Sequence, residues 1–430
     1  MVDPTGQSWA RKFLAFSPPR FSSRASIPTS LTYSLFPLRS TRRVSPSTTF
    51  KTSALVLPPR FSRTAKIPDI KRNTSTTLAT VRIGSFWWTL SIKGKTLPIL
   101  TAQSYTTMVE LLAAGEILVD MIPEQVGEYS KVLSFRKCFG GAPFNTAIGA
   151  ARLGAKVGAL CAVGEDQFGK FLLDTLKANG IDISGVVVKH ARTSLAFVLR
   201  REGGERDFFF YRKPWAETAD TMLSPSDLRP STFSGVRIFH YSGVALSHEP
   251  CRGAMGKAVE LARQAGAMVA FDPNIREDLW ENPEELRRVY HEAMKKADIL
   301  LLAREEAEWL FGTSEPEKVE KAASKYRPKY LCLKLGGEGC YVVSGRERAR
   351  IPAFRVKVRD TTGAGDAWAA GFEVGLLRGL PLEGCATLAS AVAALCVTEV
   401  GAITALPTLE KVRRFLKHLK IELNLKRAST

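Results

Sequence analysis

The sequence predicts an α/β fold with a mostly parallel central sheet, helices on both faces, and a small β-sheet over one end. From Met108 onward, short β-prone apolar runs alternate with longer helical patterns, as is typical of parallel strands joined by crossover helices. Between residues 192 and 215 this alternation is interrupted by two β-prone runs joined by Glu-Gly-Gly-Glu, a hairpin signal. Because a hairpin does not fit that layer order, we expect it to form a lid.

The predicted elements follow one another in this alternating order. In the first half we expect strands at 111–122, 156–163 and 237–241, helices at 144–153, 166–179 and 251–265, and the hairpin at 194–201 and 206–212. In the second half we expect strands at 268–271, 299–302, 330–335, 339–343 and 350–354, with helices at 284–296, 305–311, 316–325, 364–377, 382–397 and 409–417. Gly180, directly after the second helix, suits the position that follows a helix.

The composition indicates a globular protein and excludes several other classes. Hydrophobic residues make up 45% of the 430 residues, enough to bury a large core. No apolar run reaches the length of about 18 residues that a membrane-spanning helix requires. The seven cysteines form no CxxC pair and the five histidines no HxxxH spacing, so we expect neither a disulfide framework nor a zinc site.

Basic charge is concentrated in residues 1–107, which hold 16 Lys or Arg and two acids, a net charge of +14, whereas 108–430 carry +5. This Ser/Arg-rich leader has no sustained apolar period, so we expect it to be disordered. It is either an organelle transit peptide, a start placed too far upstream of Met108, or a nucleic-acid-binding arm. The first interpretation predicts a plastid or mitochondrion, the second the cytoplasm. The folded domain is expected at 108–417, with lid elements around 122–138 and 192–215 and a basic tail at 418–430.

The stretch from Arg359 to Gly371, RDTTGAGDAWAAG, holds the strongest functional signal. Thr-Gly-Ala-Gly opens directly into an apolar helix, and glycines let the backbone bend sharply and approach a ligand closely. Free N–H groups at a helix N-terminus form an anion site. Asp366 lies in the first turn of this helix. From the local pattern alone it is either a charge that stabilises the helix or a general base beside a bound phosphate.

Two motifs resemble the signatures of a known family. The run Asp360-Thr-Thr-Gly-Ala-Gly-Asp366 resembles the C-terminal signature of the ribokinase-like (PfkB-type) carbohydrate kinases. Gly140-Gly-Ala-Pro-Phe-Asn145, followed by Ala151-Arg-Leu-Gly154, resembles the N-terminal signature. The two lie more than 200 residues apart in the expected order, and the resemblance spans Met108 to about Leu409. It implies a ribokinase-like three-layer α/β/α domain with a mostly parallel central sheet and a small β-sheet lid.

Within the family the sequence is most similar to fructokinases, for example at Gly164–Gly169 and Asp272–Arg276. The resemblance implies an enzyme that transfers the γ-phosphate of ATP to a sugar hydroxyl with Mg²⁺, and K⁺ is a further candidate cofactor. Sugar and ATP are the expected partners; nucleic acid and membranes are not. One alternative is 2-keto-3-deoxygluconate kinase, which needs a cation such as Arg212 or Arg276 for the substrate carboxylate. Another is a catalytically silent regulatory protein, which the presence of Asp366 disfavours.

The resemblance also implies roles for individual residues. Asp366 is the expected base, and Gly363, Ala364 and Gly365 the expected cradle for the transferring phosphoryl group. The residues expected to face the sugar are Asp120, Gly140, Gly141, Asn145, Arg212 and Asn274. Those expected to hold the nucleotide are Lys334, Gly336 and Gly339. Glu308 matches the glutamate of the family's metal motif, whose Asn position is Glu305 here, and Asp360 lies where members organise a monovalent-cation site.

Most of these positions also have an ordinary structural interpretation. Turn chemistry would explain the paired glycines, Asp120 and Asn274, and helix capping would explain Asn145. Arg212 is alternatively an exposed lid charge, and Glu308 part of a solvated helix face. Gly164–Lys170 imitates a phosphate-binding loop, but Phe171 follows where Ser or Thr is required, so that interpretation is rejected.

The run Phe208-Phe-Phe-Tyr211 lies on a predicted lid strand. It either packs onto its own domain or pairs with a second subunit, because exposed apolar strands favour association. Lid-to-lid dimers are common in the family that the sequence resembles. We therefore expect a homodimer through the lid.

Overall fold

The computed structural model describes residues 108–125, 127–200 and 206–423, and three short strands nearer the N-terminus. These strands, β1 (Thr76–Thr77), β2 (Thr89–Ile92) and β3 (Lys95–Pro98), form a sheet of their own. The other residues of the predicted leader and residues 424–430 of the predicted tail lie outside the described part, as do the predictions made for them. Within the described residues no helix is long and apolar enough to cross a membrane.

The body of the domain is a nine-stranded sheet in the order β16-β15-β14-β13-β12-β11-β4-β7-β8. Neighbouring strands from β14 to β8 are parallel, and β15 and β16 are antiparallel additions at one edge. The strands are β4 (Leu111–Ala114), β7 (Val157–Gly164), β8 (Asp182–Lys189), β11 (Ile238–Ser242), β12 (Met268–Asp272), β13 (Ile299–Ala303), β14 (Tyr330–Lys334), β15 (Cys340–Ser344) and β16 (Glu347–Ile351).

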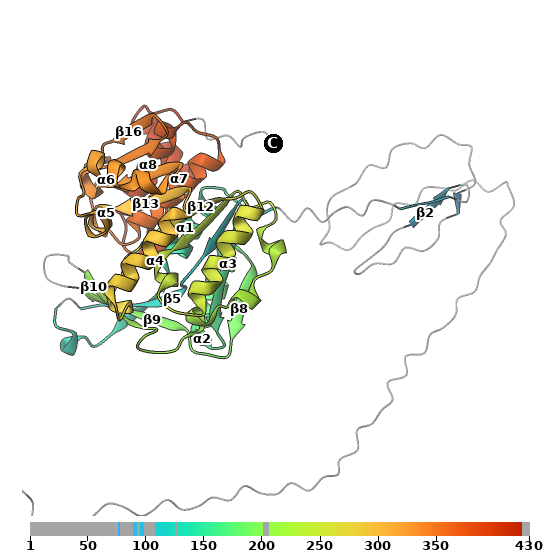
Figure 1. Cartoon of the computed structure of the whole chain (residues 1–430), viewed down its shortest axis with the longest axis horizontal. Helices are drawn as coiled ribbons and strands as arrows, with labels where there is room; N and C mark the ends of the chain where they lie inside the picture. Colours follow the sequence, from blue (N-terminus) through green and yellow to red (C-terminus); the bar gives the residue numbers. More distant parts are fainter. Residues whose placement is uncertain are drawn as a thin grey trace, which may run out of the picture. The chain divides into compact units, whose positions relative to one another are not determined.

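Helices cover both faces of this sheet and make it the middle of three layers (Figure 1). Successive residues of a strand point to opposite faces, so Leu111 and Ala113 pack in one hydrophobic core while Leu112 and Ala114 pack in the other. The helices are α1 (Ala142–Arg152), α2 (Gln167–Ala178), α3 (Cys251–Gln264), α4 (Pro283–Lys295), α5 (Arg304–Phe311), α6 (Pro316–Ala323), α7 (Ala364–Leu377), α8 (Leu382–Cys396), α9 (Ala402–Ala405) and α10 (Leu409–His418).

A second, four-stranded sheet forms the predicted lid, and its strands β5, β9 and β10 lie together at the lower left of the folded domain in Figure 1. Its order is β10 (Arg206–Tyr211), β9 (Ser194–Arg200), β5 (Leu118–Pro123) and β6 (Phe135–Gly140). The hairpin of β9 and β10 confirms the prediction from the sequence. The single run predicted over 111–122 divides into β4 and β5, which belong to different sheets. The division falls at Gly115, whose φ of 140° is seldom available to other residues.

The remaining short elements are 3₁₀ turns in the connections. They are η1 (Tyr129–Lys131), η2 (Ala219–Met222), η3 (Pro225–Asp227), η4 (Pro230–Phe233), η5 (Gly243–Leu246), η6 (Glu277–Leu279), η7 (Ser324–Tyr326) and η8 (Gly336–Glu338).

Helix α7 is held between α1 and α8 by contacts that only small residues allow. A Cβ atom added at Gly371 would lie 2.6 Å from the Cα of Ala389 on α8. On α1, a Cβ at Gly149 would lie 2.8 Å from the Cβ of Ala370. Because these contacts leave no room for displacement, the first turn of α7 has a fixed place relative to both neighbouring helices.

We expect Gly371→Ala to lower the free energy of unfolding by about 1–3 kcal/mol, because the added methyl group overpacks the contact between α7 and α8. Gly256→Ala on α3 is the matched control, since no atom lies within 4 Å of a Cβ added there. That control should stabilise the protein by about 0.4–1 kcal/mol. Denaturant unfolding measures both changes, and equal effects of the two substitutions would contradict the packing described here.

Candidate active site

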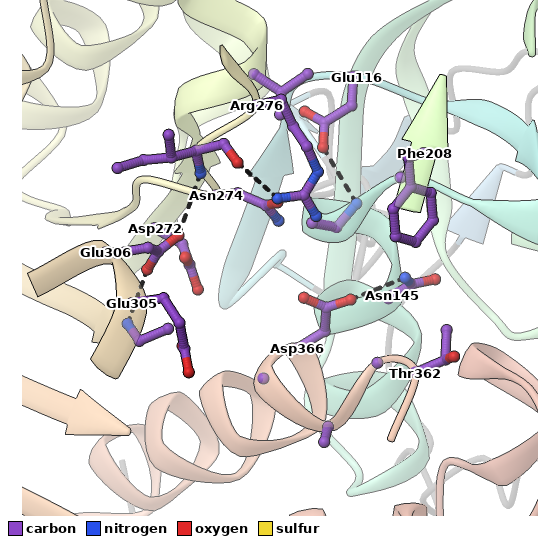
Figure 2. A pocket seen from close by; sticks show the side chains of 18 of the residues that line it. Glu116, Asn145, Phe208, Asp272, Asn274, Arg276, Glu305, Glu306, Thr362 and Asp366 are labelled. Carbon is purple, nitrogen blue, oxygen red and sulfur yellow. Dashed lines mark hydrogen bonds between the residues drawn. The ribbon is translucent and has the colours of Figure 1, made fainter. Parts of the chain in front are cut away.

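A cavity of about 580 Å³ lies at the carboxyl ends of the parallel strands, where open α/β sheets bind ligands. Asp272 ends β12 and Lys334 ends β14, and both side chains line this first cavity. Phe208 and Phe210 line it from lid strand β10, so the lid forms one wall. Figure 2 shows Phe208 and Arg276 on one side of the cavity and Asp366 with Asn145 facing them.

The N-termini of α1 and α7 meet at this cavity, as their lining residues Gly141, Ala142, Ala364 and Gly365 show. Gly141 precedes α1 with a φ of 109°, and a Cβ there would lie 2.5 Å from the carbonyl oxygen of Glu116. Gly363 precedes α7 with a φ of 75°. Gly141 therefore requires glycine, and the positive φ of Gly363 favours it. Two helix N-termini directed at one cavity supply free N–H groups and positive potential suited to an anion.

Asp366 lies in the first turn of α7 at the floor of the first cavity. Asn145 of α1 donates a hydrogen bond from Nδ2 to Asp366 Oδ2 at 2.8 Å (Figure 2). Burial raises the pKa of Asp366 to about 6, an increase that nearby Asp272 reinforces and that Asn145 and Lys334 oppose. A carboxylate with this pKa is ionised at neutral pH and still basic enough to accept a hydroxyl proton, which is what a general base requires.

A second cavity of about 470 Å³ adjoins the first and shares four lining residues with it: Lys334, Thr361, Ala364 and Gly365. Its walls are largely apolar, with Trp368 and Phe354 among them, and Gly336 and Gly339 also line it. The three residues predicted to hold the nucleotide are thus together in one cavity. A largely apolar cavity beside an anion-binding helix N-terminus suits a nucleotide base and its phosphates.

The residues predicted to face the sugar are mostly gathered at the first cavity. Asp120, Gly141, Asn145 and Asn274 line it. Asn274 has a φ of 43°, which Asn tolerates better than most residues. Gly140 does not line the cavity; a Cβ there would lie 2.6 Å from the carboxyl group of Asp120, so Gly140 makes room for that side chain.

Arg212 lines neither cavity, contrary to the contact with the sugar expected from the sequence. Its side chain is 1% exposed, and Nε donates to Asp220 Oδ2 at 2.7 Å while Nη1 donates to Ser247 Oγ at 2.8 Å. Losing one partner of a buried pair of this kind costs about 3–5 kcal/mol. Because Arg212 directly follows β10, this pair anchors the lid strand to the body of the domain.

The two residues predicted to organise metal ions have different surroundings. Glu308 is exposed on α5 and lines neither cavity, whereas Glu305 and Glu306 line the first. Asp360 accepts hydrogen bonds from the backbone N–H groups of Thr362 and Gly401, both at 2.8 Å. Among the described residues no group of three or more His, Cys, Asp or Glu is arranged to hold a metal ion. A divalent cation bound here would therefore depend on one or two carboxylates, water and phosphate, and not on a cage of protein ligands.

Sequence reasoning assigned no role to several residues that line the first cavity. The most buried polar one is Glu116, which receives hydrogen bonds from Ser242 Oγ and from the backbone N–H of Ala142. Burial raises the pKa of Glu116 to about 7. The sequence offered a signal for this role, because Glu116 closely follows a short apolar strand and ligands bind at the carboxyl ends of strands in such folds. The other unassigned polar residues are Asp272, Glu277, Glu306, Thr361 and Thr362. Arg276, considered from the sequence only as a cation for a substrate carboxylate, lines the cavity as well.

Comparison with known proteins identifies the class to which this fold and site belong. Residues 108–409 match the model of the pfkB family carbohydrate kinases. The chain belongs to this family, and it is a sugar kinase with the ribokinase-like α/β fold. The three-layer architecture and small sheet expected from the sequence are thereby confirmed.

Individual relatives carry fructokinase and ribokinase names. Probable fructokinase-2 of Arabidopsis thaliana is 38% identical over 323 residues, which cover 71% of this chain and 95% of that protein. A double mutant of fructokinase from Vibrio cholerae O395, in fructose, ADP and potassium ion bound form, is 30% identical with a TM-score of 0.64, covering 72% and 98%. An E. coli protein assigned as a ribokinase II, in complex with ATP and Mg²⁺, is 27% identical with a TM-score of 0.67, covering 72% and 100%.

Asp366→Asn should lower kcat for sugar phosphorylation by about 10²–10⁴-fold, because the amide cannot accept the hydroxyl proton. In the wild type, kcat/KM for the sugar should fall as the pH drops below about 6, where Asp366 becomes protonated. Asp174→Asn, the same exchange at an exposed position on α2, should change neither quantity.

The same substitution has an effect on stability that needs no substrate. Since burial raises the pKa of Asp366, the ionised carboxylate destabilises the folded state above that pKa. We therefore expect Asp366→Asn to be more stable than the wild type at pH 8, with the difference shrinking as the pH falls below 6. Thermal unfolding across this range measures the effect, and a wild type that is the more stable protein at pH 8 would contradict the burial described for Asp366.

Proposed function

We propose that this protein is a fructokinase that uses ATP and Mg²⁺, with fructose in the first cavity and the nucleotide in the second. The observation that carries the proposal is Asp366 in the first cavity, held by Asn145 and directly preceded by Ala364 and Gly365, which line both cavities. The fructokinase relative from Arabidopsis thaliana and the fructose-bound enzyme from Vibrio cholerae support fructose as the substrate.

The charge of the first cavity supports a neutral sugar over the acid 2-keto-3-deoxygluconate. Its lining includes two cationic side chains, Arg276 and Lys334, and Lys334 is already paired with Asp272. The carboxyl groups that line it are Glu116, Asp120, Asp272, Glu277, Glu305, Glu306 and Asp366. A substrate carboxylate would be repelled by such a surface, whereas the hydroxyl groups of a neutral sugar can donate hydrogen bonds to it.

The protein's own groups account for the steps around phosphoryl transfer. Asp120 and Asn274, which line the first cavity, hold sugar hydroxyls and fix the orientation of the acceptor. Asp366 takes the proton of the attacking hydroxyl, and the N–H groups at the start of α7 stabilise the negative charge on the transferring phosphoryl group. Mg²⁺, when bound with ATP, would neutralise phosphate oxygens, and the exposed carboxylate of Glu305, which lines the first cavity, would orient it through water. The monovalent-cation site near Asp360 stays a prediction from the sequence.

The lid contributes the groups that separate the reaction from water. Leu118, Phe208 and Phe210 of its strands line the first cavity beside Asp120. Their apolar side chains exclude solvent from the acceptor hydroxyl, which limits transfer of the phosphoryl group to water. The ion pair of Arg212 with Asp220 keeps the strand that carries both phenylalanines attached to the body of the domain.

A coupled assay of ADP release tests the proposed function on the full chain with ATP and Mg²⁺. Fructose, 2-keto-3-deoxygluconate, ribose, glucose and adenosine are compared, with Asp366→Asn as the inactive control. We expect fructose to give the highest kcat/KM. A preference for 2-keto-3-deoxygluconate would overturn the choice of sugar. A folded protein that turns over none of these substrates would favour the regulatory alternative.

We further propose that the protein is a homodimer joined through the lid. The outer face of the lid sheet carries a continuous aromatic cluster, the lid aromatic face, formed by Tyr129, Phe135, Phe197, Phe209 and Tyr211. Phe197 and Phe209 stack with ring centroids 5.1 Å apart, and Tyr211 is 54% exposed. Because Phe208 and Phe210 of the same strand line the first cavity, this cluster faces the opposite way, toward a second copy.

Light scattering during gel filtration at micromolar concentration should give the mass of a dimer. Tyr211→Lys should shift that mass toward the monomer, because a charge would be buried without a partner in the joined lids. Val188→Lys, at a valine of the same 54% exposure on edge strand β8, should leave the mass unchanged. A wild type of monomer mass would overturn the dimer.

A further inference from the structure

Lys334 occupies the boundary between the two cavities, and no other cationic side chain among the described residues lines both. Its Nζ donates a hydrogen bond to Asp272 Oδ2 at 2.7 Å, across the end of β13. The two side chains are only 12% and 7% exposed. The pairing joins the ends of β14 and β12, so the ammonium group is held at one place instead of moving freely on a long side chain.

The ammonium group of Lys334 shares its surroundings with the N-terminus of α7. A Cβ atom added at Gly365 would lie 3.6 Å from Lys334 Nζ. The positive end of α7 and the lysine therefore face the same small space, directly beside Asp366. A phosphoryl group that moves from the second cavity to an acceptor in the first passes through this space.

The charge of the first cavity favours a cation at this boundary. Seven carboxyl groups line the cavity, and a phosphoryl group carries negative oxygen atoms toward them. Burial lowers the pKa of Lys334, but the charges of Asp272 and Glu306 outweigh it and raise that pKa, so the side chain stays protonated at every pH at which the enzyme would work. Arg276, the other cation of the first cavity, does not line the second.

We propose that Lys334 is a catalytic residue that contacts the transferring phosphoryl group and stabilises the charge on its oxygens between nucleotide and sugar. This inference rests on the proposed function. The sugar oxygen forms a bond to the γ-phosphorus, the bond to the β,γ-bridging oxygen breaks, and ADP leaves with that electron pair. The hydroxyl proton goes to Asp366, and Lys334 remains protonated throughout. Asp272 is a positioning residue that directs the ammonium group.

A lysine that only holds the nucleotide would behave differently from one that acts on the transferring group. An interaction made equally with bound ATP and with the transition state changes KM and leaves kcat unaltered. An interaction that strengthens during transfer changes kcat. Contact with the γ-phosphoryl group also distinguishes ATP from ADP, which lacks that group.

The experiment compares Lys334→Met, Lys334→Arg and the matched control Lys329→Met, an exposed lysine just before β14. Steady-state kinetics with fructose are combined with calorimetric titration of ADP and of a non-hydrolysable ATP analogue. We expect Lys334→Met to lower kcat by about 10²–10³-fold. It should weaken binding of the ATP analogue and leave ADP binding unchanged. Lys334→Arg should recover part of kcat, and Lys329→Met should match the wild type.

Equal weakening of ADP and ATP-analogue binding by Lys334→Met, with kcat unchanged, would overturn the proposal and leave Lys334 as a nucleotide contact. Thermal unfolding shows whether Lys334→Met folds. If it does not, Lys334→Arg and Asp272→Asn replace it, and we expect them too to weaken binding of the ATP analogue while leaving ADP binding unchanged. A wild type that phosphorylates no sugar would contradict the proposed function. In that case the binding measurements alone still decide whether Lys334 contacts the terminal phosphate.

Discussion

The hydrogen bond from Asn145 to Asp366 is the contact on which the rest of the candidate site depends. It is 2.8 Å long and joins the first turns of α1 and α7, which are 221 residues apart in the sequence. Thr146 adds a second link, donating from its hydroxyl group to the backbone oxygen of Asp366 at 3.3 Å. Both helices can approach so closely because glycine precedes each of them and small residues line their contact. This contact thereby fixes the positions of the base, the anion-binding amides and the sugar-facing groups relative to one another.

The two cavities beside this contact differ in their chemistry and therefore in the ligand that each suits. The first is acidic and suits hydroxyl groups, whereas the second is largely apolar and suits a flat base. Their boundary consists of the first turn of α7 and the ammonium group of Lys334. Catalysis of phosphoryl transfer is mostly positioning and charge stabilisation, and both are concentrated at that boundary. The lid completes the first cavity, and none of its described residues lines the second.

Local patterns predicted much of the fold and part of the site. The helix expected at 364–377 has those bounds in the structure, because glycine precedes it, its residues are almost all apolar or small, and a glycine follows it. Strand β8 went unpredicted, since its mixed burial and internal glycine give no clear period. Glu116 and Asp272 are far apart in the sequence, and they line one cavity only because the carboxyl ends of their strands lie at the same edge of the folded sheet. The buried ion pair of Arg212 and Asp220 likewise depends on the tertiary structure, and no spacing in the sequence predicts it.

A double-mutant cycle on Asn145 and Asp366 tests most directly whether the two residues act as one unit. The kcat/KM for fructose is measured for the wild type, Asn145→Ala, Asp366→Asn and the double variant, with unfolding curves for each. If Asn145 works through Asp366, its removal will lower kcat/KM in the wild type but cause little further loss beside Asp366→Asn. Additive losses in folded variants would show that the two residues act separately and would contradict the claim that Asn145 acts by positioning Asp366.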